Sequence, residues 1–393
     1  MNSRTRIAIV GGGPAGSATA IAILNALGSE HARLDLTLFT STPRQGEPTI
    51  GETIPPAATP VLTNLGLLHL VENGDHLECP GSVSVWGEDQ PGHNDFMLQP
   101  VGRGYHLDRA RFDADLLQMA ASRGCRLAQG WHLRSAKSEG QGYRLGFSRQ
   151  AANQASADLP RANEALQCQS ADFVIDATGI AAAFARRLGV ARNLFDQVLS
   201  LCTLYDLPAP SENRPAHTLV QTTEQGWWYA ARLPNRKAIV SLCTDSDTFK
   251  QDGLDAPLTW HAACLATGWF ARECLRQFGA ELQEPDRIHL KPAPSAILSA
   301  VAGERWLAVG DAASSYDSMS SAGITKALLH AEMAGKAVAH WLRAGERSLI
   351  EHYQDRVFAD FNQYLRLHHQ HYCAERRFPR SGFWQRRRLC TTL

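Results

Sequence analysis

The sequence predicts an α/β protein in which an open sheet with helices on its faces carries an inserted, mixed β layer and ends in a helical tail. Three observations predict this architecture. An apolar tetrad, Ile7–Val10, runs into a glycine cluster and then into a helical pattern. Similar short apolar runs recur at 173–175 and 306–309, as expected of strands covered on both faces. Residues 186–290 contain strand-like segments followed by a helical stretch, which indicates a second layer.

The composition is that of a folded globular protein. The chain has 393 residues, of which 44% are hydrophobic and 20% charged. Lysine plus arginine (39) balances aspartate plus glutamate (39), so no chain-wide cationic field is available to bind nucleic acid. Nine cysteines without a C-x-x-C pair indicate neither a disulfide framework nor a zinc ribbon. We therefore expect a cytoplasmic protein with no nucleic-acid partner and no metal site.

The N-terminal segment could be mistaken for a signal peptide or a membrane span, because an uncharged run from 7 to 29 follows Arg4 and Arg6. Glycines and Pro14 interrupt this run after four apolar residues, which argues against both, and we expect no membrane span. The pattern is that of a strand, a tight turn and a helix. Leu34–Phe39 supplies the next strand and completes a βαβ unit.

The turn of this unit carries Gly11, Gly13 and Gly16 in the spacing G-x-G-x-x-G, with Pro14 and Ala15 between the last two. This spacing lets the backbone turn sharply and approach a pyrophosphate, while the helix N-terminus supplies N–H donors. Its position between a buried strand and a helix favours a dinucleotide site. The alternative is a glycine-rich connection that binds no ligand.

Further elements follow from local patterns. Asp108 is expected to cap a helix that ends at Gly124. The segment 138–170 is polar and indicates a surface loop or an edge hairpin. The clearest helical spacing in the chain runs from Ile324 to Leu342.

Two later segments point to a family. Asp176-Ala-Thr-Gly179 and Gly310-Asp311-Ala-Ala313 each follow a predicted buried strand, and they resemble the A-T-G and G-D-A segments of FAD enzymes with the hydroxylase fold. The resemblance implies an FAD-binding, Rossmann-type (hydroxylase-like) domain. It gives Asp311 the role of holding the ribityl chain and assigns Thr178 and Gly179 to the cofactor site. The helix that begins near Gly323 and Ile324 would point its N-terminus at the pyrimidine end of the flavin.

Four more segments are similar to flavin-dependent tryptophan halogenases. They are Gly51-Glu-Thr-Ile-Pro55, Tyr105-His-Leu-Asp108 with the following Arg109, Gly226-Trp-Trp-Tyr229, and Asp317-Ser-Met-Ser-Ser-Ala-Gly323. With the ending Glu375-Arg-Arg-Phe-Pro379, they resemble more closely the halogenase-like monooxygenases that mature quinone cofactors by hydroxylating a tryptophan in a partner protein.

This resemblance implies an FAD-dependent monooxygenase that hydroxylates an electron-rich aromatic ring, a tryptophan or indole, within a partner protein or peptide. Electrons would come from NAD(P)H or from a flavin reductase. Two alternatives remain open, a flavin-dependent halogenase and a non-catalytic flavoprotein that escorts a partner. The sequence carries no signal of the oligomeric state.

The chain departs from the family pattern at three places. Thr40 stands where such enzymes usually carry an acidic residue for the adenosine ribose, and a weaker hydrogen bond there would cost about 1 kcal/mol, or roughly 5-fold in FAD affinity. The stretch Glu78–Trp86 contains no lysine, whereas the halogenases carry one in this region, which disfavours halogenation. Ser318 replaces a proline that is usual in the loop before the long helix.

The candidate catalytic residue is Glu52, as a general base or a substrate hydrogen-bond acceptor; the alternative is a role in stabilising its loop. Arg109 is assigned to the cofactor site by the resemblance. Four aromatic residues are candidates for the walls of a substrate pocket, although neighbours in a strand point to opposite faces, so at least one should pack in a core. They are Trp86, Trp227, Trp228 and Tyr229.

The C-terminal segment is basic, with six arginines between Arg376 and Arg388 beside Phe383 and Trp384. These arginines could dock an acidic partner, which our prediction favours, or the aromatic residues could pin the tail to its own body. A cluster of His368, His369, His371 and Cys373 precedes them, and we expect a solvated helix there.

The predicted FAD-binding domain is discontinuous and comprises 1–80, 101–185 and 291–345. The substrate domain comprises 81–100 and 186–290, and 346–393 form a C-terminal helical tail.

Overall fold

The computed structural model describes residues 4–42, 51–149, 166–209 and 214–389. At its centre lies a six-stranded sheet in the order β20-β21-β12-β1-β2-β8, parallel except for β20. Its strands are β1 (Thr5–Val10), β2 (Leu34–Thr40), β8 (Arg126–Gln129), β12 (Phe173–Asp176), β20 (Ala302–Gly303) and β21 (Trp306–Ala308). The predicted α/β fold, with its buried parallel strands, is confirmed.

Helices pack against this sheet and against one another. They are α1 (Pro14–Leu27), α4 (Arg109–Ser122), α5 (Ala183–Arg187) and α9 (Gly323–Ala344). A Cβ on Gly335 of α9 would lie 2.5 Å from the Cβ of Ala22 in α1, so a glycine is needed where these two helices meet. The carboxylate of Asp108 caps α4 as predicted, accepting a hydrogen bond from the backbone N–H of Arg111 at 3.1 Å.

An antiparallel sheet of β9 (Trp131–Glu139), β10 (Gly142–Arg149) and β11 (Gln167–Ala171) adds to the same core. Phe147 of β10 stacks on Phe39 with ring centroids 4.4 Å apart. The segment 138–170 was predicted as a loop or hairpin; its ends form these strands, and 150–165 lie outside the described residues.

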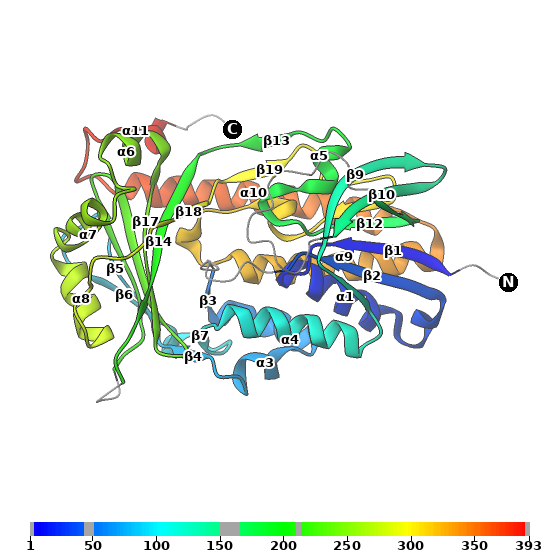
Figure 1. The fold of residues 1–393 in the computed structure, drawn as a ribbon, viewed down its shortest axis with the longest axis horizontal. Helices are drawn as coiled ribbons and strands as arrows, with labels where there is room; N and C mark the ends of the chain where they lie inside the picture. Colours follow the sequence, from blue (N-terminus) through cyan, green and yellow to red (C-terminus); the bar gives the residue numbers. More distant parts are fainter. Residues whose placement is uncertain (1–3, 43–50, 150–165, 210–213, 390–393) are drawn as a thin grey trace.

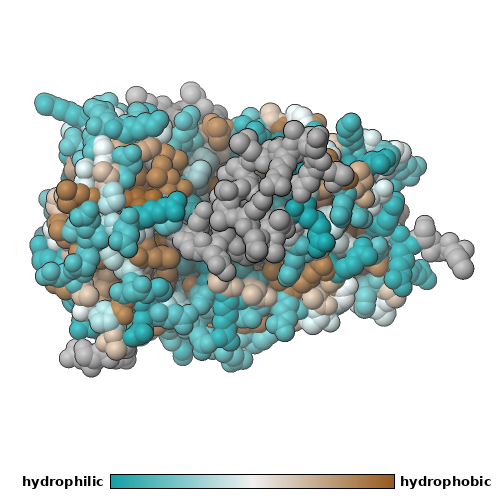
Figure 2. Space-filling model, in the orientation of Figure 1, coloured by the Kyte–Doolittle hydropathy of each residue, from teal (hydrophilic) through white to brown (hydrophobic). Residues whose placement is uncertain are grey.

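The inserted layer is a seven-stranded mixed sheet in the order β18-β14-β17-β16-β15-β5-β6, on the left in Figure 1. Its strands are β5 (Gly81–Val85), β6 (Gly92–Asp95), β14 (Val198–Asp206), β15 (Thr218–Thr223), β16 (Gly226–Leu233), β17 (Lys237–Asp245) and β18 (His289–Pro292). Helices α7 (Pro257–Leu265) and α8 (Trp269–Phe278) cover it, while α6 (Ser246–Gln251) follows β17. Figure 2 shows hydrophobic residues gathered over this sheet on an otherwise largely hydrophilic face.

Small elements connect the two large sheets. One short sheet pairs β7 (Gly104–His106) with both β3 (Thr53–Ile54) and β4 (Leu77–Cys79), and a second contains β13 (Arg192–Leu194), β19 (Ala296–Leu298) and β22 (Ser314–Ser315). Helices α2 (Thr59–Leu65) and α3 (Leu68–Glu72) lie between β3 and β4 in the chain.

The C-terminal tail consists of the long helix α10 (Ser348–Ala374) and the short helix α11 (Gly382–Leu389). The start of α10 is part of the main core through Tyr353 and Phe361, and its end contributes Tyr372 to a cluster with Trp227 of the seven-stranded sheet. The tail therefore extends from one sheet to the other (Figure 1). None of the described helices is long and apolar enough to span a membrane.

Candidate functional site

The glycine loop joins β1 to α1, and its glycines have different surroundings. A Cβ on Gly11, whose φ is +115°, would lie 2.1 Å from the carbonyl oxygen of Ala177. A Cβ on Gly16 would lie 1.9 Å from the carbonyl oxygen of Gly11. A Cβ on Gly13 would meet no atom within 4 Å. Gly11 and Gly16 thus permit close backbone approach, and Gly13 leaves open space above the loop.

The first turn of α1 is suited to an anion. Gly13 is its N-cap and Pro14 its first residue, and the turn has neither a side-chain cap nor an acidic residue. Its backbone N–H groups and positive dipole end are therefore left for a ligand. Thr40, at the end of β2, lies beside this loop, since a Cβ on Gly12 would lie 2.4 Å from its Oγ1.

The end of β12 supplies a second wall of the same site. The Asp176 carboxylate accepts hydrogen bonds from Thr178 Oγ1 at 2.6 Å and from the backbone N–H groups of Phe184 and Ala185, both at 2.9 Å. Gly179 has a φ of +63°, and a Cβ there would meet no atom within 4 Å. Asp176 thus fixes the Thr178-Gly179 turn beside open space.

Asp311 follows β21 and lies close to the glycine loop. A Cβ on Gly310 would lie 2.6 Å from the Cβ of Ala15, so the two motifs are in contact. The Lys326 ammonium, only 5% exposed, donates to Asp311 Oδ1 at 2.8 Å and to the carbonyl oxygen of Ser314. Burial lowers the pKa of Lys326, and Asp311 opposes this shift. The Asp311 side chain stays 43% exposed, so its carboxylate is both fixed and accessible.

The loop before α9 begins at Asp317 and leads to Gly323 and Ile324. Its first residue is anchored by the tail, because Tyr372 Oη donates to Asp317 Oδ2 at 2.5 Å. This anchor holds the loop although Ser318 replaces the usual proline. A Cβ on Gly323 would meet no atom within 4 Å, and Ile324 is buried.

Glu52 lies in a separate buried cluster between the two large sheets. It is 2% exposed, burial raises the pKa of its carboxyl, and its Oε2 has no hydrogen-bond partner among the described residues. The adjacent Thr53 hydroxyl lies 2.9 Å from Tyr229 Oη and 3.0 Å from His106 Nδ1. A buried carboxyl from the loop before β3, a phenol from β16 and an imidazole from β7 are thus brought together.

Arg109, assigned to the cofactor by resemblance, holds the loop that carries Glu52. Its Nη1 donates to the carbonyl oxygen of Gly51 at 2.9 Å, and its Nη2 pairs with Asp113 at 3.1 Å. This arginine therefore ties the start of α4 to the Glu52 loop.

The four candidate pocket aromatics do not form one accessible wall. Trp228 is 1% exposed and packs in the core under α7 and α8, with its ring 4.9 Å from that of Trp260. Trp227 is also 1% exposed and donates from Nε1 to Tyr372 Oη at 3.0 Å. Trp86 donates to the carbonyl oxygen of His371. Alternation along β16 and coverage by the tail explain this, and Tyr229 alone contacts the Glu52 cluster.

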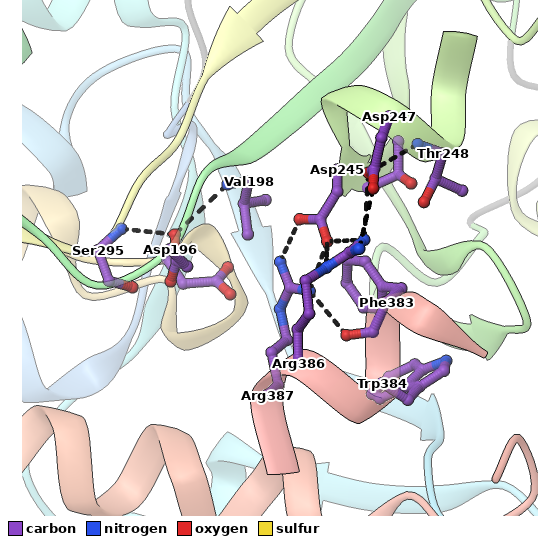
Figure 3. A network of polar contacts seen from close by, with 12 residues as sticks. Asp196, Val198, Asp245, Asp247, Thr248, Ser295, Phe383, Trp384, Arg386 and Arg387 are labelled. Carbon is purple, nitrogen blue, oxygen red and sulfur yellow. Dashed lines mark hydrogen bonds and ion pairs between the residues drawn. The ribbon is translucent and has the colours of Figure 1, made fainter. Parts of the chain in front are cut away.

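Arg386 and Arg387 of the tail bind this chain's own carboxylates, so these two arginines are not free to form the predicted basic docking surface. Figure 3 shows Arg386 and Arg387 pointing from α11 toward Asp245. Arg387 forms two bonds to that carboxylate, at 3.0 and 2.6 Å, and Arg386 also reaches Asp247 at 2.9 Å. Phe383, 1% exposed, is buried beneath them. The charges of Arg386 and Arg387 are thus neutralised within the chain, and the buried Phe383 and Trp384 pin the tail.

Two histidines of α10, His368 and His369, differ from the predicted solvated helix, whereas His371 is exposed. His368 Nε2 lies 3.3 Å from Asp317 Oδ2 and 3.7 Å from Asp196 Oδ2. His369 contacts the carbonyl oxygen of Arg387 at 3.2 Å. The described residues contain no group of three or more side chains suited to hold a metal ion.

Taken together, the glycine loop, Thr40, the Thr178-Gly179 turn and Asp311 surround one open region, and this arrangement fits a pyrophosphate-bearing dinucleotide. Local sequence signals found these residues. Sequence reasoning missed Lys326, Thr53 and His106, because each contacts a partner outside its own local segment. The one available signal was that Lys326 is a lone lysine among the largely apolar residues that begin its helix, which indicates a buried charge with a partner.

Known proteins resemble the chain over nearly its whole length. It is 28% identical to LodB of Marinomonas mediterranea, named as an FAD-dependent oxidoreductase, over 98% of this chain and 97% of that protein. It is 24% identical to the 1H-pyrrole-2-carbonyl peptidyl-carrier-protein chlorinase of Pseudomonas fluorescens, over 89% of this chain and 80% of that one. The structure matches that of the flavin-dependent halogenase CmlS with a TM-score of 0.80 and 25% identity, over 98% of this chain and 68% of that chain.

Residues 4–363 match the family model described as the FAD binding domain, which covers most of the chain. Together with these relatives, the match shows that the protein belongs to the FAD-binding domain family and is an FAD-dependent oxidoreductase of the halogenase and monooxygenase group.

Proposed function

We propose that the protein hydroxylates an electron-rich aromatic ring, an indole or a tryptophan side chain, with FAD as its cofactor. The observation that carries this proposal is the absence of lysine from Glu78–Trp86, the region where similar halogenases carry one. The fully buried Lys326 is paired with Asp311 instead. The lack of a lysine in this stretch favours oxygen transfer over halogen transfer.

The residues have separate tasks in this proposal. When bound, FAD supplies the activation of molecular oxygen. The first turn of α1 and Gly13 receive the pyrophosphate, and Asp311, fixed by Lys326, receives the ribityl chain. Glu52 and Tyr229 supply the polar groups of a buried site from which water is largely excluded.

The substrate class is supported by the names of similar proteins. One solved structure with the same fold, at a TM-score of 0.73 and 23% identity, is a peptidyl tryptophan dihydroxylase essential for tryptophylquinone cofactor biogenesis. A relative 26% identical over 90% of this chain and 65% of its own length is a tryptophan 2-halogenase of Chondromyces crocatus. Both names contain tryptophan. That the ring belongs to a partner protein rests on the first of them, because the tail arginines no longer support it.

Halogenation is the second candidate, favoured by the chlorinase, the tryptophan halogenase and CmlS among the similar proteins. The test is to incubate the FAD-loaded protein with oxygen, NAD(P)H or a flavin reductase, and tryptophan or tryptophan-containing peptides, in excess chloride or bromide. We expect the mass of the product to increase by whole oxygen atoms. A halogenated product formed over many turnovers would replace the proposal with the second candidate.

The same assay tests the remaining alternative, a non-catalytic escort protein. An escort protein would bind FAD and partner and consume no NAD(P)H.

A further inference from the structure

We propose that Glu52 is kept as a neutral carboxylic acid by a one-way chain of hydrogen bonds through Tyr229, Thr53 and His106 to the carbonyl of Ala216. In this form its one hydrogen is given to Tyr229, and it presents only the unpartnered Oε2 to its site, as a neutral hydrogen-bond acceptor. This differs from the base that its position in the sequence suggested. The chain of bonds follows from the hydrogen-bond geometry together with the neutral states of His106 and Tyr229, and only its consequence for catalysis rests on the proposed function.

The chain begins at the imidazole of His106. Strands β3 and β7 pair Thr53 directly with His106, and His106 is completely buried. Its Nε2 lies 2.9 Å from the carbonyl oxygen of Ala216, which can only accept a hydrogen bond. Nε2 therefore carries the hydrogen. Burial lowers the pKa of His106 to about 4, so at neutral pH the ring is uncharged and Nδ1 is a bare acceptor.

The two hydroxyl groups must then point in one direction. His106 Nδ1 can only accept, so the Thr53 hydroxyl, 3.0 Å away, donates its single hydrogen to it. The Thr53 oxygen is left to accept, and the donor is the Tyr229 hydroxyl at 2.9 Å. Burial raises the pKa of Tyr229 well above its ordinary value, so its one hydrogen is present and is committed to Thr53.

Glu52 closes the chain. The Tyr229 hydroxyl is also a hydrogen-bonding neighbour of the Glu52 carboxyl. Because that hydroxyl has already given its hydrogen to Thr53, it can only offer a lone pair to Glu52. A lone pair is satisfied by a protonated carboxyl and repelled by a carboxylate. The direction of the bonds therefore selects the neutral acid.

The unpartnered oxygen of Glu52 supports the same state independently. Oε2 is buried and has no hydrogen-bond partner among the described residues. An orphaned oxygen costs far less in a neutral acid than in a carboxylate, whose charge would lie in a medium of low polarity.

The charged and titratable neighbours do not reverse this outcome. The backbone N–H groups of Glu52 and Gly51 and the charge of Arg109 favour ionisation of Glu52, and a Tyr229 hydroxyl that donated to it would do the same, but burial outweighs all of them and raises the pKa. The Cys202 thiol, whose pKa burial raises to about 12, stays neutral. On the other side, His217 and Arg232 both disfavour a charged His106.

The test is the infrared band of a protonated carboxyl, assigned by the difference between the wild-type protein and Glu52→Gln, both FAD-loaded and without substrate. We expect the band at neutral pH in the wild type.

Thr53→Val removes the acceptor of Tyr229, whose hydroxyl can then turn and donate to Glu52. The pKa of Glu52 should fall and the band should weaken, whereas Thr53→Ser, which keeps the hydroxyl, should resemble the wild type.

Thr63→Val is the matched control, because the Thr63 hydroxyl is exposed and donates only to its own helix at Thr59. If Thr53→Val does not fold, Tyr229→Phe gives the same information: the band should remain and move to the higher frequency of an unbonded acid. The proposal is overturned if the wild type lacks the band, or if either variant raises the pKa of Glu52. Because no turnover is measured, failure of the proposed function would leave these outcomes unchanged.

Discussion

The ion pair between Arg387 and Asp245 predicts that one arginine of the tail determines how stably the tail is attached. Arg387 is 4% exposed and Asp245 10%, and two hydrogen bonds join them. Removing one partner of a buried pair typically costs about 3–5 kcal/mol, because the other charge stays buried. For Arg387→Ala we expect the lower end, about 3 kcal/mol, since Arg386 still contacts Asp245.

Arg386→Ala is the matched control. Arg386 contacts the same carboxylate but is 47% exposed, and pairs of this kind contribute about 0.2–1 kcal/mol. Both losses are to be measured by urea unfolding followed by circular dichroism. Replacing both partners, in Arg387→Met with Asp245→Asn, should recover much of the loss, because no unpaired charge remains. Equal losses for the two alanine variants, or no recovery in the double variant, would refute this reasoning.

Three further predictions concern the cofactor site and acid stability. Gly13→Ala should fold normally and lose FAD affinity in a flavin fluorescence titration, since its Cβ would enter the open space; Gly11→Ala, with its Cβ 2.1 Å from a carbonyl oxygen, should lower the melting temperature as well. Thr40→Glu should tighten FAD binding by roughly 5-fold in the same titration, and unchanged affinity would contradict the ribose role. Hydrogen bonds from Arg377 and Thr222 outweigh burial and lower the pKa of Glu375 to about 2. A carboxyl group whose pKa is lower in the folded protein than in the unfolded chain, where it is about 4.3, stabilises the fold above that pH. This stabilisation is lost as the pH falls toward the pKa of the folded protein. In Glu375→Gln the free energy of unfolding should therefore not fall over this pH range.

The sequence predicted the elements whose determinants are local. The strand Ile7–Val10, the glycine loop and the helix capped by Asp108 each depend on residues within about one turn or one strand, and all are present. The segments around Thr178 and Asp311 were found for the same reason, since each directly follows a buried strand. Their convergence on one open region follows from the parallel sheet, whose strands end at a common edge.

The tail and the Glu52 cluster could not be predicted because their contacts join distant parts of the chain. Arg387 binds an aspartate 142 residues earlier, and Thr53 bonds a tyrosine 176 residues later. A run of arginines shows the sign of a charge and not the location of its counter-charge. The strand Gly226–Leu233 is intermediate: alternation predicted that its aromatic residues would separate, but not that the tail would cover Trp227.

Covering Trp227 gives the tail a structural connection to the proposed cofactor site. The Tyr372 hydroxyl accepts from Trp227 Nε1 and donates to Asp317, the first residue of the loop before α9. A single buried hydroxyl thus joins the tail, the seven-stranded sheet and the loop that leads to the N-terminus of α9. Each of these hydrogen bonds contributes only about 1 kcal/mol, but they fix the same oxygen from two sides. The arginines of α11 lie next to this point, since the Arg387 guanidinium lies 5.3 Å from the Tyr372 ring. The pairing of Arg386 and Arg387 with Asp245 is therefore better understood as fastening the tail beside the loop before α9 than as preparing a surface for a partner.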